Sequence, residues 1–440
     1  MKNIRYFIVT LLAAVASFTA MAQSGLNGTW NGVLTVSGVE LTLVLHVDPV
    51  ECTMDSPDQG AYGIPAQIKE ITASRIHVEV PSIGASFEGN LMFGLLVGKF
   101  KQSGMEFPMS LKPGDIERNR PQTPQEPYPY AIEEVTFTNP EDGAVLSGTL
   151  TYPADYSSET PVVLLVSGSG LQNRDEEVYA HKPFLVIADH LARNGIASLR
   201  YDDRSVGKST GNAVGATTET FKKDALGGLE FLRSLNKFSK IGLAGHSEGG
   251  TIAFLLAGEG KTDFIISLAG TATDGATVLV EQNRKILQGS GIPDSAVNDY
   301  CEVLAKLYAD PDMTAEELDK LASGIVPDMK QNIMRIRETK DPWVQHFISF
   351  DPGEAIRKIE CPVLALNGEN DVQVIADSNI PRLQELLKDN GKNLIKTYPG
   401  LNHLFQHCTT GMPDEYGKIE ETISVEVLED ITSWISRITL

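Results

Sequence analysis

Cysteine is scarce in this chain, and the few cysteines present do not form a metal-binding pattern. The 440 residues contain four, and none lies in a CxxC pair or at a Cys/His spacing typical of zinc. That absence excludes the common structural zinc domains. In an oxidising compartment four cysteines allow three complete disulfide pairings, and buried free thiols are the simpler interpretation. The four are Cys52, Cys301, Cys361 and Cys408.

Positive charge is also in short supply. Lysine and arginine number 37 against 58 aspartates and glutamates, which gives a formal net charge of −21. A surface of this sign repels nucleic acid and anionic membranes, so we expect no nucleic-acid partner. The same balance disfavours polyanionic substrates.

Long apolar runs are confined to the beginning of the chain. Lys2 and Arg5 precede the stretch YFIVTLLAAVA, and the stretch AMA (Ala20 to Ala22) offers small residues around a cleavage point. This arrangement is typical of a secretory signal peptide over residues 1–22, cleaved near Ala22 and Gln23. We therefore expect an exported protein, periplasmic or secreted. No later stretch is long and apolar enough to cross a bilayer, so we expect no stable membrane insertion after cleavage.

Helical periodicity is missing from residues 23–113. Short runs rich in β-branched residues, such as WNGVLTV, LTLVLHV and RIHVEV, are separated there by Gly, Pro or Asp. This pattern predicts a small N-terminal all-β domain, which we expect to be a sandwich or a partial barrel. Residues 114–134 are rich in proline and lack apolar periodicity, which predicts a stiff linker.

Strand-like and helix-like segments alternate over residues 135–440. Runs such as PVVLLVSG, IASLRYDD and KIGLAGHS alternate with helical stretches such as FLVIADHLARNG and GGTIAFLLAG. This alternation predicts parallel βαβ units and an α/β fold with helices on both faces of a mostly parallel sheet. Residues 271 to about 350 contain helical stretches without a strong strand. We expect them to form a helical cap inserted over a pocket.

Two serines of this domain lie in the pattern G-x-S-x-G. Ser247, in GHSEG, lies between the strand-like KIGLA and the helix-like GGTIAFLLAG, a context that raises a nucleophilic hydroxyl above a sheet. Ser209, in GKSTG, lies in polar, glycine-rich sequence, and we interpret it as a loop residue. A phosphate loop is excluded there, because Asp202 stands where such a loop requires glycine.

A nucleophilic serine needs a base and a carboxylate that orients the base. Asp371 follows the strand-like PVLALNG, and His403 follows the strand-like LIKTYPG. Strand ends of a parallel sheet meet at one edge, so we predict a catalytic triad of Ser247, His403 and Asp371. The alternatives for acid and base, less well placed, are Glu369, Asp377 and His407.

Attack on a carbonyl also requires backbone N–H groups that hold the developing oxyanion. Glu248 follows the serine directly, and Ser169 lies in the glycine-rich loop SGSGLQNRDEE after the strand-like PVVLLV. We predict that the amides of Ser169 and Glu248 form this oxyanion hole. His246 neighbours the serine in sequence, and we interpret it as a packing residue.

With these residues in place, the chain resembles the α/β-hydrolases. It is similar to exported bacterial hydrolases of the serine aminopeptidase-like (hydrolase_4, S33) type over roughly residues 125–440. The stretches SGSGLQNRDEE, YDDRSVGKSTG, GHSEGG and NGENDVQV…GLNHLF carry the similarity. Members usually have histidine where this chain has Ser167 and glycine where it has Ser205. The resemblance implies a carboxylesterase acting on a small-molecule ester, with no metal and no organic cofactor.

Other functions remain open at this point. A serine peptidase would use the same triad on short peptides, and an aminopeptidase would also need acidic groups, such as Glu281 of the expected cap, to hold the substrate's N-terminus. A transferase or thioesterase would form the same acyl-enzyme. In a non-catalytic binding protein the β domain would matter most.

Overall fold

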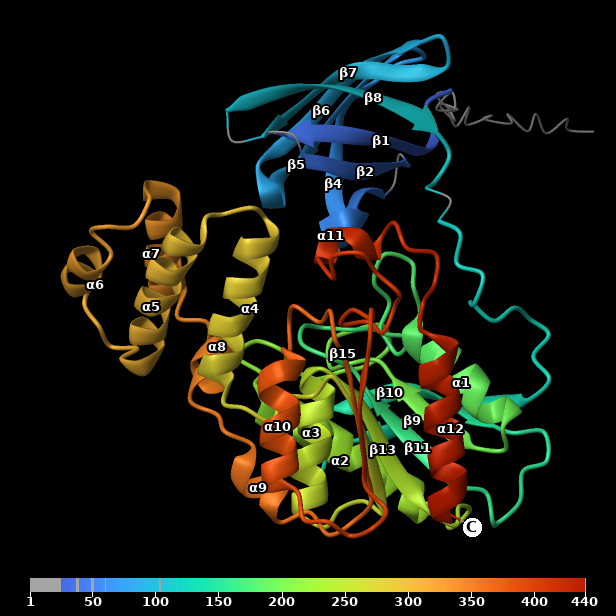
Figure 1. The fold of residues 1–440 in the computed structure, drawn as a ribbon. Helices are drawn as coiled ribbons and strands as arrows, with labels where there is room; N and C mark the ends of the chain where they lie inside the picture. The colour runs from blue at the N-terminus through green and yellow to red at the C-terminus, as the bar shows by residue number, and fades with distance from the viewer. Residues whose placement is uncertain are drawn as a thin grey trace, which may run out of the picture. The chain divides into compact units, whose positions relative to one another are not determined.

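The computed structural model describes residues 25–36, 39–48, 51–59, 61–102, 104–116 and 118–439. The expected signal peptide, residues 1–22, lies outside the described residues. Contacts divide the chain into two compact units, Met1–Glu117 and Arg118–Leu440 (Figure 1). Within the described ranges, no helix combines the length and the apolar character needed to cross a membrane.

The first unit is a closed antiparallel barrel of eight strands. Each strand pairs with the next, and Trp30 of the first strand pairs with Pro113 of the last, which closes the sheet. The predicted all-β domain is confirmed, but the prediction of a sandwich or partial barrel is wrong. Apolar side chains such as Trp30, Leu45 and Phe87 fill the core of the unit. The strands are β1 (Gly28–Val36), β2 (Val39–Val47), β3 (Cys52–Ser56), β4 (Ala61–Ile71), β5 (Arg75–Val80), β6 (Ala85–Met92), β7 (Leu95–Gln102) and β8 (Met105–Pro113).

The second unit is built on an eight-stranded sheet in the order β16-β15-β14-β13-β11-β12-β10-β9. The second strand, β10, pairs antiparallel with both of its neighbours, and the other pairs are parallel. The predicted α/β class with a mostly parallel sheet is confirmed. The strands are β9 (Ala131–Thr138), β10 (Val145–Tyr152), β11 (Val162–Val166), β12 (Ala197–Tyr201), β13 (Ile241–His246), β14 (Phe264–Leu268), β15 (Val363–Gly368) and β16 (Leu394–Tyr398).

Helices cover both faces of this sheet (Figure 1). One face packs against α1 (Pro183–Arg193) and α12 (Val425–Thr439). The opposite face packs against α2 (Thr218–Ser234), α3 (Glu248–Gly258), α9 (Gly353–Arg357) and α10 (Ala376–Leu386). Every residue of the central strands β11, β13 and β14 is therefore buried, which explains their continuous apolar runs.

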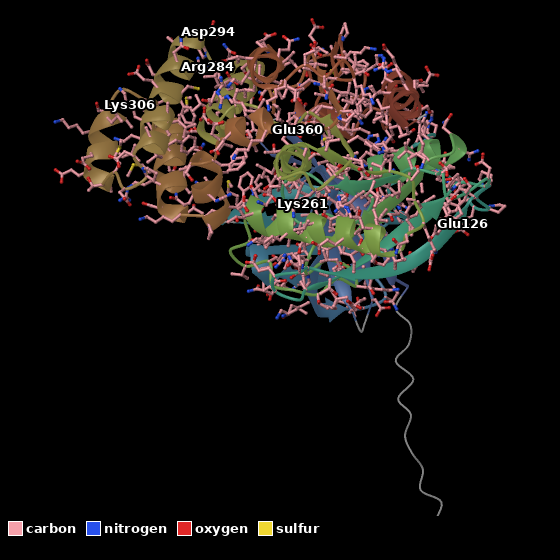
Figure 2. The ribbon with its side chains drawn as sticks, turned by 90° about the horizontal axis from the view of Figure 1, so that it is seen from below. Glu126, Lys261, Arg284, Asp294, Lys306 and Glu360 are labelled. Carbon is pink, nitrogen blue, oxygen red and sulfur yellow. The ribbon has the colours of Figure 1, made fainter. Side chains whose placement is uncertain are left out.

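A helical cap is inserted between β14 and β15, as predicted. It has an apolar core of its own, with Tyr300 and Leu304 at its centre. Charged residues such as Asp294 and Lys306 lie on its outer surface (Figure 2). The cap helices are α4 (Gly275–Gly289), α5 (Asp294–Ala309), α6 (Ala315–Leu321), α7 (Pro327–Thr339) and α8 (Pro342–Ile348).

Polar contacts hold the proline-rich segment before β9 against the rest of the second unit. The Arg120 guanidinium donates hydrogen bonds to the carbonyls of Tyr179 (2.8 Å), Gly417 (3.0 Å) and Ile419 (2.9 Å). The Gln122 side chain donates to the Ile423 carbonyl at 2.7 Å. These contacts hold the segment against the residues that precede α12.

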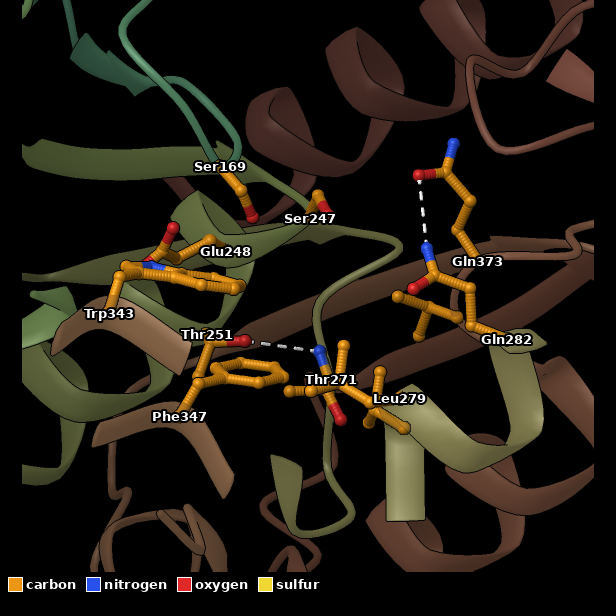
Figure 3. A pocket seen from close by; sticks show the side chains of 12 residues that line it. Ser169, Ser247, Glu248, Thr251, Thr271, Leu279, Gln282, Trp343, Phe347 and Gln373 are labelled. Carbon is orange, nitrogen blue, oxygen red and sulfur yellow. Dashed lines mark hydrogen bonds between the residues drawn. The ribbon is translucent and has the colours of Figure 1, made fainter. Parts of the chain in front are cut away.

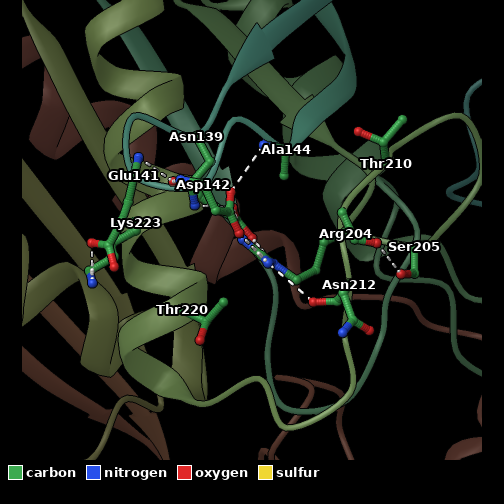
Figure 4. A network of polar contacts seen from close by, with 12 residues as sticks. Asn139, Glu141, Asp142, Ala144, Arg204, Ser205, Thr210, Asn212, Thr220 and Lys223 are labelled. Carbon is green, nitrogen blue, oxygen red and sulfur yellow. Dashed lines mark hydrogen bonds and ion pairs between the residues drawn. The ribbon is translucent and has the colours of Figure 1, made fainter.

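The loop that contains Ser209 is held by structural interactions. Ser209 Oγ accepts a hydrogen bond from the Ser147 N–H (2.9 Å) and donates one to the Asp202 carbonyl (2.7 Å). Arg204 is only 2% exposed and makes two hydrogen bonds to the Asp224 carboxylate, at 2.7 and 2.8 Å. Ser205, whose hydroxyl donates to the Gly211 carbonyl, has a left-handed φ of 65°, a conformation that favours glycine (Figure 4).

Candidate active site

Ser247 lies on the sharp turn between β13 and α3. Its φ is 52° and its ψ is −117°, a strained conformation for a residue with a side chain. The flanking glycines of the motif make the turn feasible. A Cβ on Gly245 would lie 2.0 Å from the Gly249 carbonyl oxygen, and a Cβ on Gly249 would lie 2.1 Å from that of Val166. This is the local geometry of a nucleophile elbow, which holds the serine hydroxyl above the end of the sheet.

Asp371 and His403 are brought together from two different strand ends. His403 Nδ1 donates to Asp371 Oδ2 at 2.7 Å, and both side chains are buried. Asp371 also accepts hydrogen bonds from the N–H groups of Gln373 (2.8 Å) and Val374 (2.9 Å). Because Nδ1 carries the proton of this bond, Nε2 of the neutral imidazole is left as the basic nitrogen.

His246 links His403 to the nucleophile elbow. Its ring lies 4.7 Å from the ring of His403, centroid to centroid, and its Nε2 bonds to the His403 carbonyl at 2.9 Å. The structure therefore places His403 beside the residue that precedes Ser247. Among the described residues, none makes a hydrogen bond with Ser247 Oγ. In free enzymes the bond from the serine to its base is often long and forms only with substrate present.

The loop after β11 lies against the elbow. A Cβ on Gly168 would be 3.2 Å from Ser247 Cβ, so the two backbones approach closely. Within the described ranges, the backbone N–H groups of Ser169 and Glu248 donate to no other group. Both residues line the pocket in front of Ser247. The two amides predicted for the oxyanion hole are thus unengaged and close to the serine.

Glu176 supports this arrangement, although no motif in the sequence singled it out as a functional residue. Its carboxylate Oε1 accepts the Gly168 N–H at 2.7 Å and bonds to His246 Nδ1 at 3.0 Å. The largest single influence on the pKa of His246 is burial, which lowers it. The charge and hydrogen bond of Glu176 raise the pKa, as do the His403 carbonyl and Asp371. Together they outweigh burial, so the pKa lies above its ordinary value. His246, predicted as a packing residue, is thus a polar link between the glycine-rich loop and His403.

Asp203 is a second buried acid that holds this loop. It accepts the Gln172 N–H at 2.9 Å and the Ser167 hydroxyl at 3.2 Å. Ser167 therefore anchors the loop through its hydroxyl group. Burial raises the pKa of Asp203 to about 7, although the Gln172 and Ser167 hydrogen bonds lower it. Both Glu176 and Asp203 lie in stretches that carried the family resemblance.

Asp203→Asn is expected to change how stability depends on pH. Between the ordinary pKa of 3.8 and the folded value of about 7, the folded state retains a proton that the unfolded state releases. Asp203 therefore lowers the free energy of unfolding as the pH rises through this window, by up to about 4 kcal/mol. The neutral amide removes this effect, so the variant should gain stability relative to the wild type between pH 4.5 and pH 8, measured by urea unfolding.

The control for this measurement is Asp377→Asn, which changes an exposed acid of α10. Its pH dependence should follow that of the wild type. A parallel pH dependence of the wild type and Asp203→Asn would contradict the assignment of a raised pKa to Asp203.

A small pocket opens in front of Ser247, with a volume of about 70 Å³ (Figure 3). Its walls come from the elbow and from cap helices α4 and α8. The Glu248 side chain is 5% exposed and accepts hydrogen bonds from the Thr218 hydroxyl (2.6 Å) and the Trp343 indole N–H (2.8 Å). Burial raises the pKa of Glu248. The remaining lining residues are Ser169, Thr251, Thr271, Val278, Leu279, Gln282, Phe347, Gln373 and Val374.

The alternative acids and bases lie elsewhere. His407 has 67% of its side chain exposed and bonds to Glu421 at 2.8 Å. Glu369 and Asp377 are exposed, and in the described part of the chain neither bonds to His403. All four cysteines are free thiols, with Cys52 and Cys301 buried.

Comparisons with known proteins indicate a family of hydrolases. The family model described as "Serine aminopeptidase, S33" (Hydrolase_4) matches residues 181–407. Esterase EstD of Thermotoga maritima is 28% identical over 296 residues, which are 66% of this chain and 65% of EstD. The chain thus spans just under two thirds of the length of that relative.

Solved structures that match part of the chain include an esterase and a proline iminopeptidase. An esterase of Pyrococcus furiosus is 15% identical, with a TM-score of 0.43 over 74% of this chain and 98% of that one. A proline iminopeptidase of Mycobacterium smegmatis is 13% identical, with a TM-score of 0.43 over 70% of this chain and 99% of that one.

Proposed function

The chain belongs to the serine aminopeptidase S33 family of hydrolases, and on that premise we propose that it hydrolyses carboxylic esters through an acyl-enzyme on Ser247. The observation that carries the proposal is the buried Asp371–His403 pair placed beside the elbow that bears Ser247. The name of the relative EstD points to the same reaction class.

The reaction begins when Ser247 Oγ attacks the acyl carbonyl carbon. His403 Nε2 takes the serine proton, and Asp371 stabilises the resulting imidazolium through the bond to Nδ1. The negative charge on the carbonyl oxygen is held by the amides of Ser169 and Glu248. His403 then gives its proton to the leaving alcohol, and the ester C–O bond breaks. Water next attacks the acyl carbon while His403 takes its proton. The bond to Ser247 Oγ breaks, the acid is released, and His403 returns the proton to Ser247 Oγ.

The charges around the pocket favour an ester over the N-terminus of a peptide. An aminopeptidase needs a carboxylate to pair with the substrate ammonium, because a buried unpaired charge costs several kcal/mol. Among the described lining residues the single acid is Glu248, and its Oε1 already accepts two hydrogen bonds. Glu281 of α4 is not part of the lining and accepts the Ser378 hydroxyl at 2.6 Å.

Three substrates of matched size test this proposal. We expect the wild-type protein to turn over p-nitrophenyl butyrate, and butyryl p-nitroanilide far more slowly because its leaving amine needs protonation. Adding the α-amino group, in 2-aminobutyryl p-nitroanilide, should lower kcat/KM by about two further orders of magnitude. The reason is that the ammonium finds no carboxylate to pair with. If the aminoacyl anilide is instead the best of the three, the enzyme is an aminopeptidase.

A further inference from the structure

We propose that Trp343 is the wall that restricts this enzyme to esters of short-chain acids. The inference rests on the proposed function, because it concerns the acyl group transferred to Ser247. It adds the substrate class and names the residue that determines it.

Two cavities meet at Trp343. The pocket in front of Ser247 holds about 70 Å³. A second cavity of about 420 Å³ lies among Leu171, the loop before α2, Phe221 and the first turn of α8. Trp343 and Ser169 line both cavities. The larger cavity has the volume usual for a small-molecule site, whereas the pocket at the nucleophile is far below it.

The indole of Trp343 is fixed in place between the two cavities. Its Nε1 donates to Glu248 Oε1 at 2.8 Å, and its ring stacks on Phe347 with centroids 4.8 Å apart and planes 11° apart. Glu248 is itself held by the Thr218 hydroxyl at 2.6 Å (Figure 3 shows Trp343 beside Glu248). A side chain that is hydrogen-bonded at its edge and stacked on its face is a rigid partition.

The acyl group, and not the alcohol, is the part of the substrate that Trp343 restricts. The leaving oxygen must face His403 to receive its proton, and the carbonyl oxygen must face the amides of Ser169 and Glu248. The second cavity is lined from the loop after β11, the loop before α2 and α8. Within the described ranges, it takes no residue from the loops that carry Asp371 and His403. The acyl chain therefore extends from Ser247 toward Trp343 and stops there.

Removing the indole joins the two cavities into one acyl channel. Wild-type kcat/KM should fall by roughly tenfold or more between p-nitrophenyl butyrate and p-nitrophenyl octanoate, because the longer chain meets the ring. In Trp343→Ala the octanoate-to-butyrate ratio of kcat/KM should rise by at least about tenfold. Trp343→Phe keeps a ring in the partition but removes the N–H donor, so its ratio should stay nearer to that of the wild type.

The matched control is Gln345→Ala, which changes an exposed residue of the same helix that lines neither cavity. Its ratio should equal that of the wild type. Thermal unfolding and labelling by a fluorophosphonate show whether each variant is folded with a reactive serine. If Trp343→Ala does not fold, the proposal is still tested by the chain-length profile of the wild type and by the octanoate-to-butyrate ratio of Trp343→Phe.

The outcomes separate this inference from the proposed function. A wild-type protein that hydrolyses neither ester refutes the proposed function. A wild-type protein that hydrolyses octanoate as well as butyrate refutes the role of Trp343 alone. So does a folded Trp343→Ala protein with an unchanged ratio.

Discussion

Ser247→Ala is expected to lower kcat for p-nitrophenyl butyrate by about four to six orders of magnitude. The hydroxyl is the atom that forms the acyl-enzyme, and alanine offers no nucleophile in its place. The unfolding midpoint should change little, because the strained turn is set by its neighbours and Ser247 Oγ makes no hydrogen bond within the described residues. Covalent labelling by a fluorophosphonate probe should disappear with turnover.

Ser209→Ala is the matched control, because Ser209 occupies the other G-x-S-x-G motif. It should retain turnover and probe labelling. It should also lose about 1–3 kcal/mol of stability, since the buried Ser147 N–H loses its acceptor. If Ser247→Ala kept wild-type turnover, the assignment of the nucleophile would be wrong. If Ser209→Ala abolished labelling while folded, the two serines would have to exchange roles.

Asp371→Asn is expected to lower kcat by about four orders of magnitude with little change in KM. The carboxylate accepts the proton of His403 Nδ1, whereas an amide can present an N–H to that nitrogen and leave His403 with the wrong tautomer. The buried imidazolium would also lose its counter-charge. Steady-state kinetics on p-nitrophenyl butyrate measure both effects.

Glu369→Gln provides the control for this variant, because Glu369 is the neighbouring acid on the same loop and is exposed. Its kcat should be that of the wild type. An equal loss in the two variants would mean that the charge of the loop, and not the bond to His403, supports the reaction.

The positions of the three proposed catalytic residues could be predicted because each follows a strand-like run. In a parallel sheet the carboxyl ends of the strands gather at one edge, so the order of motifs along the chain already predicts which residues meet there. Ser247, Asp371 and His403 all follow this rule, and the last two are hydrogen-bonded. The need for glycines around Ser247 could also be predicted, because a nucleophile elbow has no room for a Cβ at those positions.

The supporting contacts were not predictable in the same way. Glu176, His246 and the His403 carbonyl are joined by two hydrogen bonds that span 70 and 157 residues of sequence. Periodicity describes local structure and carries no information on which polar side chains meet across such distances. Trp343 likewise lies in a short helix of the cap, where no pattern indicates which face turns toward Ser247.

The sequence by itself determined the α/β class, the inserted cap, the all-β first unit and the residues proposed for catalysis, because these depend on local periodicity and on motifs at strand ends. Only the tertiary structure decided that the first unit closes into a barrel. It also decided that buried acids hold the glycine-rich loop, and that Trp343 lines both a small cavity and a larger one. The physical reason is that closure, buried ion pairing and cavity shape arise from contacts between segments far apart in the chain, and those contacts exist only once the chain has packed.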